Sequence, residues 1–77
     1  MNELVEYLVN NIIGNEGYEI MLIEDDNEVE IKLTVDKDKI AKLIGKGGRT
    51  AKAIRSIVKA ASSGTDKRYD VTINEAV

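Results

Sequence analysis

The 77-residue sequence predicts one α+β domain, over residues 1–77, in which three helices cover one face of a three-stranded mixed sheet. Two observations predict it. Apolar residues follow a helical or a strand-like spacing in six segments, in the order helix, strand, strand, helix, helix, strand. Two helices also separate the last two strands, and a crossover of that length joins parallel strands. A right-handed crossover would place the helices together on one face of the sheet.

The first half of the chain predicts a helix followed by a β-hairpin. Helical spacing of apolar residues predicts a helix over 3–13, which Gly14 can end. An apolar run predicts a strand over 18–24, and strict alternation predicts a second over 28–35. The polar turn between them makes an antiparallel pair.

The second half predicts two helices and a strand. Asp36 or Asp38 is expected to cap the second helix, and a glycine cluster at 45–48 ends it. The third helix is expected over about 48–61, and alternation predicts the last strand over 69–74.

The composition excludes several classes of function. The chain has no cysteine and no histidine, so disulfides, thiolate metal sites and imidazole catalysis are excluded, and we expect no metal and no cofactor. The sequence has no apolar run near the ~20 residues of a membrane helix, and no basic segment that opens a signal peptide. We therefore expect a cytoplasmic protein.

The charges are sorted along the chain. Residues 1–38 hold eleven acidic and two basic side chains, a balance of −9, whereas residues 39–77 hold nine basic and three acidic ones, a balance of +6. Such asymmetry indicates an anionic partner for the second half. Attraction between the two halves within the fold is the alternative explanation.

The most informative segment is the loop Gly45-Lys46-Gly47-Gly48 between the two predicted helices. Glycine allows the backbone to approach a ligand closely, and amides at the start of the following helix favour a phosphate. Cations then continue at helical spacing, as Lys39, Lys42 and Lys46 before the loop and Arg49, Lys52, Arg55 and Lys59 after it. The last four lie within an arc of about 120° on the helix. This pattern predicts a polyanion site, although most charged helix faces only contact water.

The segment Ile44-Gly45-Lys46-Gly47-Gly48 resembles the Ile-Gly-x-x-Gly motif of KH domains, and the α-β-β-α-α-β order resembles their type II, bacterial form. The chain is most similar to small bacterial KH proteins of the KhpA kind. The resemblance implies that the loop clamps single-stranded RNA of about four nucleotides and that Ile44 contacts bases. The expected RNA-binding residues are Lys42, Ile44, Gly45, Lys46, Gly47, Gly48, Arg49, Lys52 and Arg55. The resemblance also implies a role in post-transcriptional regulation or RNA chaperoning.

Other nucleotide sites fit the loop poorly. A P-loop needs Ser or Thr after its lysine, but Gly47 follows Lys46, and Thr50 stands where a dinucleotide motif needs glycine. An enzyme is not expected. The sequence has no Phe or Trp and no tyrosine in the motif, so we expect affinity to come from phosphate contacts and aliphatic packing. The acidic turn 24–28 is expected to border the RNA groove and narrow the footprint.

An interaction module is the alternative function. Strand 18–24 has apolar residues on both of its faces, which leaves an apolar patch for a partner subunit. We therefore expect a homodimer, and the resemblance implies a larger KH-containing protein as a further possible partner.

Overall fold

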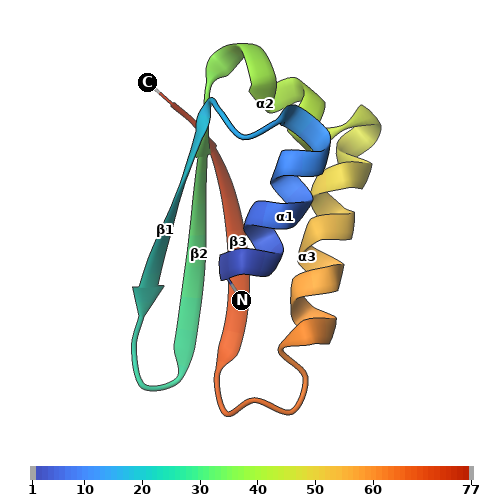
Figure 1. Ribbon diagram of the computed structural model, residues 1–77. Coiled ribbons are helices and arrows are strands. Elements are labelled where there is room, and N and C mark those ends of the chain that lie inside the picture. Colours follow the sequence, from blue (N-terminus) through green and yellow to red (C-terminus); the bar gives the residue numbers. More distant parts are fainter. Residues whose placement is uncertain (1, 77) are drawn as a thin grey trace.

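The computed structural model describes residues 2–76 and confirms the predicted α-β-β-α-α-β order (Figure 1). The elements are α1 (Asn2–Ile13), β1 (Tyr18–Glu24), β2 (Glu28–Val35), α2 (Lys37–Ile44), a short 3₁₀ turn η1 (Lys46–Gly48), α3 (Arg49–Ala61) and β3 (Arg68–Glu75). The predicted bounds differ from these by one residue at most. No helix among the described residues is long and apolar enough to cross a membrane.

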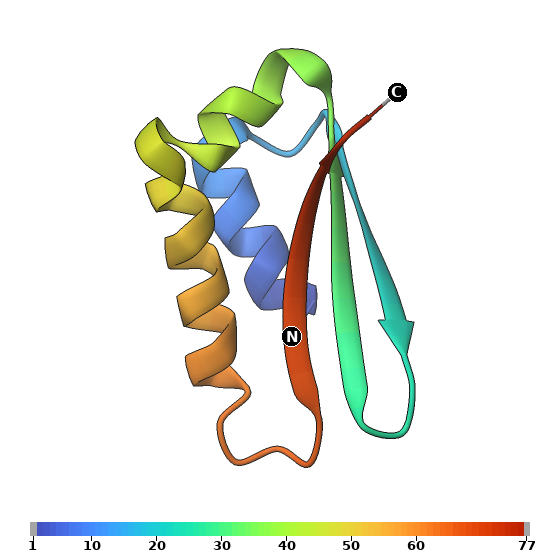
Figure 2. The same cartoon turned by 180° about the vertical axis from the view of Figure 1, so that it is seen from behind.

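The sheet has the strand order β1-β2-β3 and mixes both kinds of pairing. β1 runs antiparallel to β2, with Leu22 opposite Ile31, and β3 runs parallel to β2, with Val71 opposite the same Ile31. The parallel pair is joined through α2 and α3. Figures 1 and 2 show the three helices on the same face of the sheet, as the crossover predicted.

β2 lies at the centre of the core. Its alternate side chains, Val29, Ile31, Leu33 and Val35, are buried under the helices. The other buried apolar residues of the core cluster are Val5, Val9, Ile13, Leu43, Ile54, Val58 and Val71. They come from all three α-helices and from β3, so burial of this cluster fixes α3 beside β3. The position of α3 also determines where the glycine loop lies, because the loop directly precedes this helix.

The caps of α2 differ in part from the prediction. Asp36 stands at the N-cap, but its carboxylate makes no capping hydrogen bond. Its main-chain carbonyl instead accepts hydrogen bonds from the amides of Lys39 and Ile40, at 2.9 and 3.0 Å. At the other end Gly45 stops the helix, and its amide donates to the carbonyl of Ala41 at 3.0 Å.

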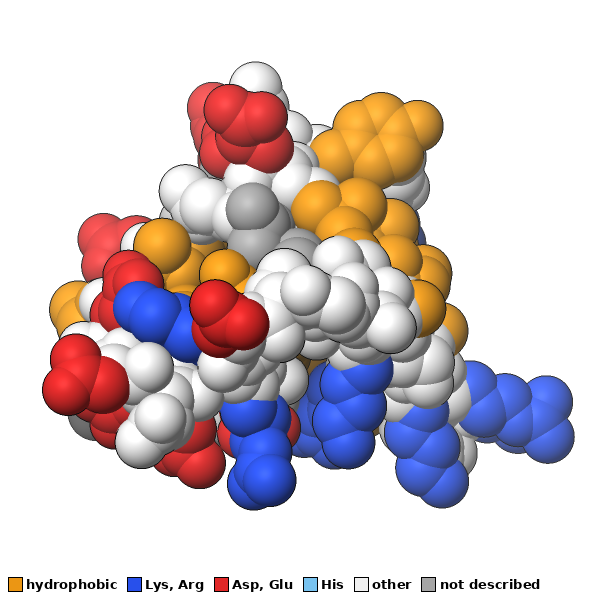
Figure 3. Space-filling view, turned by 90° about the horizontal axis from the view of Figure 1, so that it is seen from below, with side chains coloured by type: hydrophobic (Ala, Val, Ile, Leu, Met, Phe, Trp, Pro, Cys, Tyr) orange, Lys and Arg blue, Asp and Glu red, His pale blue; other side chains and the backbone are white. Residues whose placement is uncertain are grey.

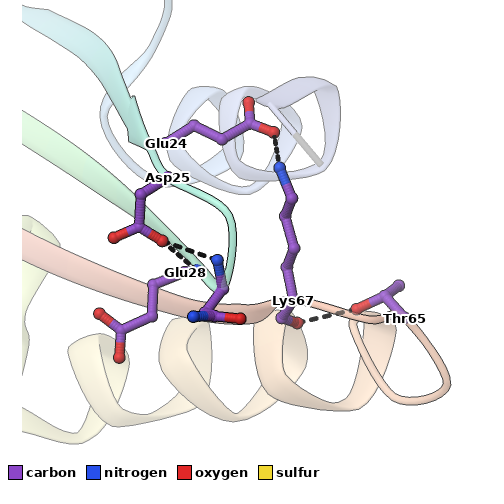
Figure 4. A network of polar contacts seen from close by, with 6 residues as sticks. Glu24, Asp25, Glu28, Thr65 and Lys67 are labelled. Atoms are coloured by element: carbon purple, nitrogen blue, oxygen red, sulfur yellow. Dashed lines mark hydrogen bonds and ion pairs between the residues drawn. The ribbon is translucent and has the colours of Figure 1, made fainter.

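The β1–β2 turn is held by Asp25. Its Oδ1 accepts hydrogen bonds from the amides of Asn27 and Glu28, at 2.8 and 2.7 Å, and these bonds lower the pKa of the carboxyl group. Figure 4 shows the turn beside the segment that precedes β3, where Glu24 forms an ion pair with Lys67. The turn therefore binds the segment between α3 and β3 to the hairpin.

The open face of the sheet is less apolar than the sequence suggested. Met21 and Ile23 of β1 lie on it and are 61% and 46% exposed. Their partners across the β1–β2 pair are Lys32 and Glu30, which are charged. Apolar surface on this face is therefore confined to the β1 edge, and the expected apolar patch is correspondingly small.

Candidate nucleic-acid interface

The glycine loop folds as the motif requires. Gly45, Gly47 and Gly48 adopt φ of +79°, +65° and +77°, a region that L side chains rarely occupy. The amide of Gly48 donates to the carbonyl of Gly45 at 3.1 Å, which closes the turn between α2 and α3. The sequence therefore needs glycine at these positions for local reasons, before any ligand is considered.

The middle of the loop is free to contact a ligand. Lys46 and Gly47 are exposed. Within residues 2–76, neither of their amides donates a backbone hydrogen bond to another segment, whereas those of Gly45 and Gly48 do. Unpaired amides next to a helix start attract anions, because the amide hydrogens and the helix dipole both point toward the ligand.

A row of cations extends from the loop along α3. We call the six residues Lys42, Lys46, Arg49, Lys52, Arg55 and Lys59 the basic row, and all six are exposed. Within the part of the chain that the structure describes, only Lys67 and Arg68 form ion pairs with carboxylates. Figure 3 shows Lys and Arg side chains gathered along one side of the molecule and most of the visible acidic ones on the others. The basic row is therefore free to pair with a polyanion.

Lys39 does not belong to this row, contrary to the spacing argument. Its Nζ donates a hydrogen bond to the main-chain carbonyl of Glu16 at 3.0 Å. The side chain crosses toward the α1–β1 connection and lies against Gly17. Helical spacing alone could not show this, because the contact depends on where the preceding loop runs.

A groove of about 370 Å³ lies between α3 and the edge strand β3. Its lining residues are Lys52, Arg55, Ser56, Lys59, Tyr69, Asp70 and Val71. Arg55 spans the groove, since its Nε donates to the main-chain carbonyl of Val71 at 3.3 Å. Two of the predicted RNA-binding residues, Lys52 and Arg55, thus lie in a groove whose other wall the sequence did not reveal.

The remaining predicted site residues surround the loop. Lys42 is exposed near the end of α2, and Ile44 is half-buried at its last position, directly before the loop. Arg49 is the first residue of α3 and is exposed. The structure therefore brings the nine predicted residues together as one loop and the helix segments on either side.

Sequence reasoning missed Ser56, Tyr69 and Asp70. The only signal available for Tyr69 was the alternation of apolar and polar residues over 69–74, which did not show what the residue would lie against. The acidic turn 24–28 lies at the opposite end of the molecule from the glycine loop (Figure 1). Two of its acids, Glu24 and Glu28, pair with Lys67 and Arg68, so this turn does not narrow the site at the loop.

The site is built for binding rather than for a reaction. Its residues are glycines, aliphatic side chains, cations and one tyrosine, with Ser56 and Asp70 as the other polar groups. Within residues 2–76 no group of three or more acidic side chains could hold a metal ion. An α-β-β-α-α-β chain with a Gly-x-x-Gly turn between its last two helices is a type II KH domain.

Comparison with known proteins agrees with that class. Residues 2–73 match the family described as "KhpA/KhpB, KH domain". The RNA-binding protein KhpA of Listeria monocytogenes is 38% identical over 76 residues, which are 97% of this chain and 100% of that protein. KhpA of Oceanobacillus iheyensis is 39% identical over 95% of this chain and 99% of its own length, and KhpA of Chlamydia trachomatis is 34% identical over 97% of each. No solved structure matches the chain. The chain belongs to the KhpA/KhpB family of KH domains, a family of RNA-binding proteins and not of enzymes.

Proposed function

We propose that the chain, as a single KH domain, holds single-stranded RNA on the Gly45–Gly48 loop and on the basic row. The observation that carries this proposal is that the row is exposed, lacks carboxylate partners among the described residues, and reaches a loop whose middle amides are free. Cations placed at intervals along one helix match the repeated charges of a phosphate backbone. Ile44 supplies apolar contact for a base beside the loop.

A single strand fits this surface better than a duplex. The loop projects between two helices and can clamp about four nucleotides of backbone, which leaves bases accessible to side chains. Contacts made largely to phosphate carry little sequence information. We therefore propose a role in post-transcriptional regulation or RNA chaperoning, in which one protein acts on many RNAs. We propose that it acts in the cytoplasm.

A titration tests this function. Fluorescently labelled single-stranded RNA, duplex RNA and single-stranded DNA of the same sequence are added to the full chain, and the anisotropy is measured. We expect saturable binding of the single-stranded RNA and at least several-fold weaker binding of the duplex. Equal affinity for all three would indicate a non-specific cation surface, and no binding would refute the proposal.

A second proposal concerns self-association, and specific exposed residues favour it. Tyr7 of α1 is 66% exposed and Ile57 of α3 is 40% exposed. At 100° per residue, Ile57 lies on one flank of the buried α3 positions, whereas Arg55 and Lys59 lie on the other flank. Figure 3 likewise shows hydrophobic side chains in a band beside the Lys and Arg cluster. This band can bury apolar surface while the basic row stays open.

We propose that the partner on this surface is a second copy of the chain, with a larger KH-containing protein as another user of the same surface. A stable interface buries about 1,200–2,000 Å² in total, so each copy would cover about 600–1,000 Å² of the 5271 Å² that one chain exposes. Pairing the basic row with itself would bring like charges together, so it is a poor interface. The molecular mass in solution, measured by light scattering over a dilution series, tests the dimer.

A further inference from the structure

Tyr69 stands where the groove and the core meet. It pairs with the buried Val29 across the β2–β3 register, so its side chain lies on the helix side of the sheet. The residue is half-buried and packs against the core, yet it also lines the α3–β3 groove. The core therefore holds the ring in place while part of the ring is accessible from the groove. A ring held in this way loses little entropy when a ligand covers it.

The walls around Tyr69 are cationic on one side. Lys52, Arg55 and Lys59 of α3 line the same groove, and Arg55 is tied to β3 through its bond to the Val71 carbonyl. The groove volume, about 370 Å³, lies in the range of small-molecule sites. An aromatic ring among cations is the arrangement used to hold single-stranded nucleic acid, because bases stack on the ring and phosphates pair with the cations.

A second hollow extends the groove beyond Tyr69. Tyr69, Lys59 and Asp70 also line an adjoining hollow, which Ser62, Ser63 and Arg68 complete. The surface therefore continues past Tyr69 in both directions, as a strand would require.

We propose that Tyr69 is a base-stacking residue, and that the α3–β3 groove holds a base of the same RNA strand whose backbone contacts the glycine loop. This inference rests on the proposed function and extends the RNA site from the glycine loop toward the C-terminal end of α3. It also differs from the expectation that affinity comes from phosphate contacts and aliphatic packing alone. The strand passes the loop, runs along the basic row and places one base on Tyr69, beside Arg55.

Intrinsic fluorescence provides a direct test. The chain has three tyrosines and no tryptophan, so the variant Tyr7→Phe/Tyr18→Phe leaves Tyr69 as the only emitter. We expect a single-stranded RNA of about eight nucleotides to quench this emission as it binds. A strand of equal length that lacks bases should bind through the cations without quenching. Saturable binding of the RNA, followed by anisotropy, without any quenching would overturn the proposal.

Affinity measurements give a second test. Stacking of one base is worth about 1–3 kcal/mol, and because the ring is only partly accessible we expect Tyr69→Leu to weaken binding about five- to ten-fold. Tyr69→Phe keeps the ring and should bind within about two-fold of the parent chain. Tyr18→Leu is the matched control, because Tyr18 is also half-buried against the core but lies outside the groove, and it should bind like the parent chain.

The outcomes separate this proposal from the one it rests on. If Tyr69→Leu folds and binds as tightly as the parent chain, stacking is refuted while binding at the loop stands. If Tyr69→Leu does not fold, quenching of Tyr69 in the Tyr7→Phe/Tyr18→Phe variant decides the question. If no single-stranded RNA binds to the parent chain, both proposals fail.

Discussion

A β-carbon on Gly45 would stand 2.3 Å from the Thr50 Oγ1 and 2.8 Å from the Thr50 Cβ. Gly45 also has φ of +79°, so it is restricted both by its backbone and by its neighbour. Thr50 belongs to the first turn of α3, which packs closely over the end of α2. The first glycine of the motif is therefore needed for the joint between the helices, as well as for any ligand.

Gly45→Ala should destabilise the domain more than Gly47→Ala. Gly47 has φ of 65° and ψ of 17°, close to the left-handed helical region, which costs an alanine about 1–2 kcal/mol. Gly45 has φ of 79° and ψ of 172°, a region that essentially only glycine adopts, so its backbone cost is at least as large. At Gly47 no described atom lies within 4 Å of the added carbon, so the backbone cost is the whole effect. At Gly45 the contact with Thr50 adds to it. Chemical denaturation followed by circular dichroism measures both, and equal losses would show that the joint relaxes freely.

Lys46→Asp/Gly47→Asp should abolish RNA binding without unfolding the chain. Two carboxylates would stand beside the free amides, and a side chain at Gly47 meets no described atom within 4 Å. Aspartate is also among the residues that tolerate positive φ. Binding is measured by anisotropy with single-stranded RNA, and folding by circular dichroism.

Lys37→Asp/Gly14→Asp is the matched control for that double variant. It makes the same change in net charge, and Gly14 likewise has positive φ with open space around it. Neither residue belongs to the loop or the basic row. The control should bind RNA within a few-fold of the parent chain. Equal losses in the two variants would show that net charge, rather than the loop, governs binding.

Salt should weaken RNA binding in proportion to the cations that meet phosphates. If three or four residues of the basic row do so, log K should fall against log salt concentration with a slope of about −2 to −3. Lys52→Gln should reduce the slope by about 0.7, since one contact is lost. Titrations at several salt concentrations measure this. A slope near zero would mean that the basic row does not face the RNA.

Ile57→Glu should convert the dimer to a monomer and leave RNA binding at the loop intact. The substitution places a charge in the exposed apolar flank of α3, on the side away from Arg55 and Lys59. Met21→Glu is the control, because Met21 is also exposed but lies on the open face of the sheet. Light scattering on a dilution series gives the mass. A monomeric parent chain at high micromolar concentration would contradict the dimer.

Asp25 should make the stability of the domain depend on pH in the acidic range. The amides of Asn27 and Glu28 lower the pKa of its carboxyl group, so the charged form is favoured by folding. This contribution is fully present above the ordinary pKa of 3.8, and it is lost as the pH falls through the lower pKa of the folded state.

The variant Asp25→Ala tests this dependence. It should be less stable than the parent chain at about pH 6, and the difference should shrink below about pH 4. Asp25→Asn keeps an oxygen acceptor for the turn and should show no such change with pH. Urea denaturation at several pH values measures the free energy of unfolding. A difference that stays constant with pH would mean that the Asp25 charge does not stabilise the turn.

The sequence by itself determined the order of the elements and the glycine loop. One face of β2 is buried at the centre of the core, so apolar and polar residues alternate along this strand, with Val29, Ile31, Leu33 and Val35 on the buried face. Lys52, Arg55 and Lys59 are three and four residues apart, so the geometry of a helix predicts that they lie on the same side of α3. These features are local, because each depends on residues a few positions apart.

Only the tertiary structure decided what lies opposite the basic row. Tyr69 and Asp70 are ten or more residues away from Lys59 in the sequence, and they meet it because β3 pairs with β2 beneath α3. The same packing turned Lys39 toward Glu16 and set the acidic turn against Lys67. The spacing of apolar residues and the composition cannot predict such contacts between distant residues, because burial of the shared core determines where distant segments lie.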